Sequence, residues 1–83
     1  MKLSNDLQRK LKKHYDSNSF IESKFKGLDI AFKTDHEGNP ILLFVGKKLG
    51  DGKIKGDRFV RTLQKDLHGA IVKDHWDLKG PAN

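Results

Sequence analysis

The stretch LDIAFKTDHEGNPILLFV, residues 28–45, decides the fold. Leu28, Ile30 and Phe32 alternate with polar or small residues, which is the period of a half-buried strand. After a turn, residues 41–45 are apolar on both faces, which indicates a strand in the interior of a sheet. The stretch therefore predicts a β-hairpin.

Two further strands are expected after this hairpin. Residues 58–63 have the composition of a third strand, and residues 71 to about 78 that of a fourth. The turns at residues 35–38 and 66–69 both begin with Asp and end with Gly, which is typical of a type I turn that ends in a left-handed residue. The four strands are expected to pair in meander order.

The N-terminal region is expected to be helical. An apolar stripe recurs every four residues at Leu3, Leu7, Leu11 and Tyr15, which predicts a helix from about residue 5 to residue 15, capped by Ser4, Asn5 or Asp6. Residues 20–25 are expected to add a short helical turn, with an irregular connection that still contributes to the core as the alternative. The helical region then covers about residues 4–25 and the sheet about residues 27–79. Residues 80–83 are expected to form a disordered tail.

These elements predict the α+β class, with an N-terminal helix packed on a four-stranded antiparallel meander sheet. A chain of 83 residues has room for one hydrophobic core, so residues 1–83 are expected to form a single domain. A small curved β-barrel with a helix is the alternative, because strong curvature could close the same strands on themselves.

The composition excludes several kinds of chemistry. Without cysteine there is no disulfide, no thiolate metal site and no cysteine nucleophile, which suits a reducing compartment. The longest apolar run, residues 41–45, is far shorter than a membrane span. We therefore expect a cytoplasmic protein that has no membrane partner.

The charge indicates an anionic partner. The 17 Lys and Arg residues against 11 Asp and Glu residues give a net charge of +6, which attracts polyanions such as nucleic acid or an acidic protein. The predicted phosphate contacts are Arg9, Lys10, Lys12 and Lys13 on the helix and Arg58 and Arg61 on the sheet. For the helical run taken alone, a solvated outer face of the helix is the favoured interpretation, because Arg9 and Lys13 lie opposite the leucine stripe.

The sheet offers a second candidate surface. Lys33 faces away from the helix if Phe32 faces it, and the same outer side could hold Arg61, Lys73 and His75. With Phe59 and Trp76 between them, these residues would form a stacking platform for single-stranded nucleic acid. The favoured interpretation is instead that Phe59 and Trp76 belong to the core, because so small a domain needs its large side chains inside.

No catalytic site, metal site or cofactor is expected. His36 and His68 lie in the two similar turns, but turn tips two strands apart are roughly 10 Å or more from each other, which disfavours a shared metal. Asp74 and Asp77 point to opposite faces of a strand rather than converging as a catalytic pair. These observations favour a nonenzymatic binding module.

A second function is predicted from the interior strand. Ile41, Leu43 and Val45 point to one face and Leu42 and Phe44 to the other, whereas a single helix covers only one face. An open sheet would leave the other apolar face for a partner. The chain is therefore alternatively a protein-interaction or homodimerisation module.

Three segments resemble a group of short uncharacterised bacterial proteins. The segments are GNP at residues 38–40, KGDRFVRTL at residues 55–63 and DHWDLKG at residues 74–80, and they cover the C-terminal half. The resemblance implies a bacterial cytoplasmic protein without an assigned activity, and it carries over no site residues.

Overall fold

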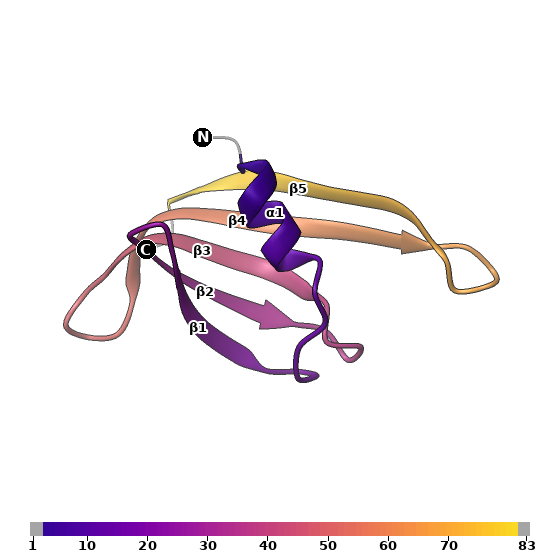
Figure 1. Cartoon of the computed structure of the whole chain (residues 1–83), viewed down its shortest axis with the longest axis horizontal. Coiled ribbons are helices and arrows are strands. Elements are labelled where there is room, and N and C mark those ends of the chain that lie inside the picture. The colour runs from indigo at the N-terminus through magenta and orange to yellow at the C-terminus, as the bar shows by residue number, and fades with distance from the viewer. Residues whose placement is uncertain (1–2, 82–83) are drawn as a thin grey trace.

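The computed structural model describes residues 3–81. Its elements are α1 (Asn5–Leu11), β1 (Phe20–Phe25), β2 (Leu28–Thr34), β3 (Pro40–Lys48), β4 (Ile54–Lys65) and β5 (Ile71–Pro81). The five strands pair with their sequence neighbours in the order β1-β2-β3-β4-β5, and every pairing is antiparallel. Figure 1 shows α1 lying across one face of this open sheet.

The α+β class and the meander order are confirmed, whereas the predicted number of strands and the alternative of a barrel are wrong. The sheet has five strands instead of four, and β1 does not pair with β5 in the described part of the chain, so the sheet is open and not a barrel. The segment predicted as a tail also differs, because Gly80 and Pro81 belong to β5, where they pair with Arg58 and Asp57. Ala82 and Asn83 lie outside the described residues.

The additional strand is β1, which was predicted as a helical turn. Its residues pair with β2 from Phe20↔Lys33 to Phe25↔Leu28, and the connection is the two-residue turn Lys26-Gly27. Both turn residues have positive φ, 48° and 82°, as a tight hairpin turn requires. Lys is uncommon at the first of these positions, so the sequence carries only a weak turn signal.

Helix α1 is shorter than predicted. The Ser4 hydroxyl accepts a hydrogen bond from the Leu7 N–H (3.2 Å) and caps the helix. The helix ends at Leu11 in a tighter turn, in which the Lys12 and Lys13 N–H groups donate to the Arg9 and Lys10 carbonyls. The chain then leaves the helix, and the Tyr15 N–H donates to the Gly38 carbonyl (2.9 Å). The Tyr15 ring still reaches the core, packing edge-on against Phe32 with ring centres 4.9 Å apart.

The two Asp-to-Gly turns have the predicted geometry. In each, the aspartate side chain accepts hydrogen bonds from the backbone N–H groups two and four residues later, at 2.8–3.0 Å. Gly38 and Gly69 both adopt positive φ, 83° and 82°. These local bonds connect β2 to β3 and β4 to β5.

The sheet has two different faces. The helix face is covered by α1, and the core lies between the helix and this face. The buried core residues are Leu3, Leu7, Leu11, Ile30, Phe32, Leu43, Val45 and Phe59. The outer face is the opposite one, and along β2 and β3 it presents the alternate residues Ala31, Lys33, Leu42 and Phe44. No described helix or strand packs across the outer face (Figure 1).

Candidate nucleic-acid interface

The six predicted phosphate contacts do not form one surface. Arg9 and Lys10 lie in α1, and Lys12 and Lys13 follow directly after it, on the side of the sheet that α1 covers. Arg58 is exposed in β4 next to the buried Phe59, so strand alternation places it on the outer face. A ligand on one face therefore cannot contact both groups directly.

The helix cations differ in how far they are neutralised. Arg9 lies 3.4 Å from Asp6, which also accepts a hydrogen bond from Lys26 at 2.8 Å. The Lys26 bond, reinforced by the charges of Lys26 and Arg9, lowers the pKa of Asp6 from its ordinary value. Lys10, Lys12 and Lys13 form no salt bridge within the described residues.

Arg61 is not on the outer face, so this part of the prediction is wrong. Its side chain is only 4% exposed, because the two-residue period from Phe59 turns it toward α1. Nε and Nη2 donate to the Asp74 carboxylate at 2.7 Å each. Nη1 donates to the main-chain carbonyls of Leu11 and Pro40 at 3.1 Å each. Arg61 therefore ties the end of α1 to β3 and β5 and has no free donor face for a phosphate.

The side chains around Arg61 are also structural. Its hydrogen bonds lower the pKa of the Asp74 carboxyl, although partial burial acts in the opposite direction. The Trp76 ring lies 5.6 Å from the guanidinium carbon and packs, partly buried, against the core. Phe59 is buried in that core. The favoured prediction that Phe59 and Trp76 belong to the core is therefore confirmed, and the two residues form no stacking platform on the outer face.

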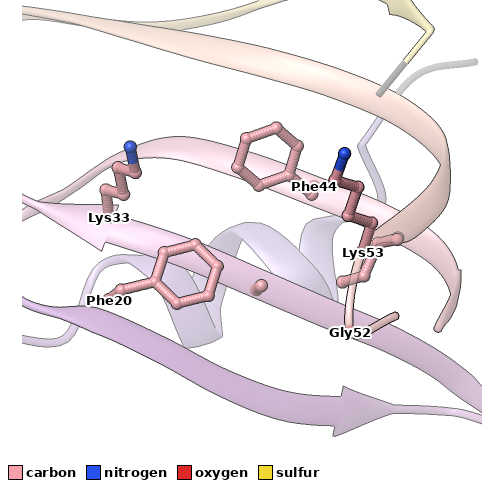
Figure 2. A pocket seen from close by; sticks show the side chains of 7 residues that line it. Phe20, Lys33, Phe44, Gly52 and Lys53 are labelled. Carbon is pink, nitrogen blue, oxygen red and sulfur yellow. The ribbon is translucent and has the colours of Figure 1, made fainter. Parts of the chain in front are cut away.

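A different pair of aromatic residues lies on the outer face. A cleft of about 320 Å³ is lined by Phe20, Ala31, Lys33, Phe44, Gly52, Lys53 and Ile54. Figure 2 shows Phe20 from β1 and Phe44 from β3 on either side of β2, with Lys33 and Lys53 at the two ends of the cleft. Phe20 is 53% exposed, so this surface combines accessible aromatic area with positive charge.

Cross-strand pairing fixes this alternation of aromatic and basic side chains. Phe20 pairs with Lys33 across β1 and β2, and Phe44 pairs with Arg58 across β3 and β4. Side chains of directly opposed residues lie next to each other on one face. Among the described residues, Lys33, Lys53 and Arg58 have no carboxylate within salt-bridge distance.

Glu22 of β1 and Asp29 of β2, acidic residues on this face, both contact Lys48. The Lys48 ammonium lies 2.6 Å from Glu22, and the Lys48 backbone N–H donates to Asp29 at 2.8 Å. The hydrogen bond to Glu22 raises the pKa of Lys48 from its ordinary value, with a smaller contribution from the charge of Asp29. The unpaired charge beside the cleft is therefore positive.

Another polar cleft, within residues 3–81, has side chains that are already bonded to other residues. A cleft of about 420 Å³ between α1 and β5 contains Asp74 and His75, but Asp74 binds Arg61 and the His75 imidazole lies 2.8 Å from Asp77. Within residues 3–81, no three His, Asp or Glu side chains gather as metal ligands. None of the helices in this part of the chain has the length and apolar character needed to cross a membrane.

Sequence reasoning missed the outer cleft because it assigned Phe20 to a helical turn. Without β1, Phe44 has no aromatic neighbour across β2, and Lys33 lacks its aromatic cross-strand partner Phe20. The alternation of Phe20, Glu22 and Lys24 with Ile21, Ser23 and Phe25 was the available signal, but a serine on the inward positions weakens it. Comparison with protein-family models, curated proteins and solved structures found no match, and the resemblance to short bacterial proteins stays a prediction.

Proposed function

We propose that this chain is a small basic binding module whose ligand is a nucleic acid, bound on the outer face of the sheet. In this proposal it binds without catalysing a reaction, in the cytoplasm of a bacterium. The observation that supports it most is the set of three unpaired cations, Lys33, Lys53 and Arg58, around two aromatic rings. We call these three residues the outer cations.

The outer face is a better candidate than the helix face for a physical reason. Lysine and arginine side chains neutralise phosphates on either face, and this contribution carries no sequence information. Only the outer face adds aromatic surface that bases can contact. Arg9, Lys10, Lys12 and Lys13 then contribute through the long-range field of the +6 charge.

The test is a salt series of fluorescence-anisotropy titrations with short DNA and RNA. The outer variant replaces Lys33, Lys53 and Arg58 by Gln. The matched helix variant replaces Lys10, Lys12 and Lys13 by Gln, so that both variants lose the same charge. On single strands, each lost phosphate contact lowers the magnitude of the negative slope of log K against log salt concentration by about 0.7.

We expect the outer variant to lose about 2 units of slope and the helix variant to keep most of it. Equal losses in the two variants would show that only net charge matters. A larger loss in the helix variant would place the ligand on the helix face. The absence of salt-sensitive binding to any nucleic acid at low ionic strength would refute the proposal.

Homodimerisation through the outer face is the second candidate. The observation that favours it is the apolar surface that α1 leaves uncovered, with Phe20 exposed and Leu42, Phe44 and Val60 half-buried. A second copy would place like charges from both sets of outer cations together, which costs free energy. Sedimentation at rising protein concentration tests this candidate, and a monomer at all concentrations would remove it.

A further inference from the structure

The cleft on the outer face is lined by two aromatic rings, Phe20 and Phe44, and by the small side chain of Ala31. Phe20 and Phe44 belong to strands on either side of β2, where Phe20 pairs with Lys33 and Phe44 pairs with Ala31, so the two residues lie diagonally across β2 with their backbones more than ~10 Å apart. The β2 residue next to Phe44 in this cleft is Ala31, and its methyl group is the smallest side chain that a strand residue other than glycine can carry. Ala31 is only 3% exposed although no helix covers it, because the neighbouring side chains rise above it.

The lining selects a ligand of a particular chemistry. The two rings and Ala31 are apolar, and the backbone groups beneath them are already bonded in the β ladder. Such a cleft offers stacking surface and few hydrogen-bonding groups, so it favours a flat aromatic ring without reading its edges. Lys33 and Lys53 at the ends of the cleft add positive charge on either side of that ring (Figure 2).

A nucleotide within a single strand has both parts of this chemistry, an aromatic base and a phosphate on each side. A duplex keeps its bases stacked and paired inside the helix, and extracting one base costs a few kcal/mol. Single strands present their bases without that cost, and they stack on aromatic side chains with little dependence on sequence.

We propose that the cleft takes one unstacked base of a single-stranded nucleic acid between Phe20 and Phe44, with the adjoining phosphates on Lys33 and Lys53. Arg58, beside Phe44, contacts the next phosphate along the strand. This inference rests on the proposed function and adds to it the form of the nucleic acid and the residues that stack.

The experiment compares three probes of equal strand length at one low salt concentration. The probes are an oligothymidylate of about 12 nucleotides, within the site sizes usual for single-strand-binding domains, the same oligomer without bases, and a duplex. The abasic oligomer has the same phosphates and lacks the stacking groups. Affinity for the oligothymidylate relative to the abasic oligomer therefore isolates the contribution of the bases.

Two variants remove the cleft without changing the charge. Ala31→Leu fills the cleft, and Phe20→Ser removes an exposed ring at small cost in stability. Ala70→Leu, in the exposed turn after Asp66, is the matched control for the added bulk. Urea denaturation checks that each variant is folded. If Ala31→Leu does not fold, Phe20→Ser alone tests the stacking site.

We expect the native protein to bind the oligothymidylate about 5- to 150-fold more tightly than the abasic oligomer, as stacking of one base predicts. Phe20→Ser and Ala31→Leu should lower this ratio toward one, and Ala70→Leu should leave it unchanged. Equal affinity of the native protein for both oligomers refutes the stacking site and leaves the polyanion module standing. The absence of binding to all three probes refutes both proposals.

Discussion

Replacing Arg61 by Met removes the most connected polar side chain in the described structure. The change leaves the Leu11 and Pro40 carbonyls without their donor and the Asp74 carboxylate without its counter-ion. Breaking a buried ion pair by removing one partner costs about 3–5 kcal/mol. Because the Asp74 side chain is 28% exposed and partly solvated, we expect a loss near the lower end, about 3 kcal/mol.

Urea denaturation measures this loss. Trp76 is the only tryptophan and lies beside Arg61, so its fluorescence reports unfolding. With a slope of about 1 kcal/mol per molar urea for a small domain, the midpoint should fall by about 3 M. Arg58→Met is the matched control, since Arg58 is exposed on the outer face, and it should change stability by no more than about 0.5 kcal/mol.

The pH dependence gives an independent check. The Arg61 hydrogen bonds lower the pKa of Asp74 in the folded state. The stabilisation is therefore fully present above the ordinary carboxyl pKa, about 4, and is lost as the pH falls through the lowered value. The Arg61→Met variant lacks this ion pair, so its stability should fall less than that of the native protein as the pH falls below about 4. A loss below 1 kcal/mol, or unchanged acid sensitivity, would refute the structural role of Arg61.

Three other changes test the fold and the site. Leu11→Ala empties a position in the core that is 0% exposed and should cost about 2–5 kcal/mol in urea denaturation; a cost under 1 kcal/mol would contradict the packing of α1. Thr34→Val removes a hydroxyl that accepts from the Ser19 N–H at 2.9 Å and donates to the Asp16 carbonyl at 2.6 Å, and it should cost about 1–3 kcal/mol, whereas an unchanged midpoint would contradict those bonds. Glu22→Gln frees Lys48 beside the cleft and should tighten nucleic-acid binding and raise the salt slope by about 0.7; weaker binding would contradict an outer-face interface.

The strongly patterned elements could be predicted from sequence. The alternation in residues 28–32, the apolar run at 41–45 and the two Asp-to-Gly turns predicted two of the strand connections, β2 to β3 and β4 to β5, because each signal is local. β1 could not be predicted in the same way. Its turn, Lys26-Gly27, has an unfavourable residue at a positive-φ position, and pairing with β2 stabilises a strand that has little preference of its own.

The candidate site was predicted only in part. Arg58 is exposed, as a phosphate contact must be, whereas Arg61, which was expected on the outer face, is buried against α1 on the opposite face. The error arose because charge alone suggested exposure, while the acceptors that stabilise a buried Arg61 come from Leu11, Pro40 and Asp74, which are distant in sequence. Phe20 and Phe44 come together only through β2.

The central claim is that the ligand lies on the outer face. The most direct measurement is an NMR titration of the native protein with an oligothymidylate at low salt, following every backbone amide. We expect the largest shift changes at Phe20, Ala31, Lys33, Phe44 and Lys53, and small changes in α1. Changes concentrated in α1 and at Lys12 and Lys13, or no changes at saturating oligomer, would contradict the account.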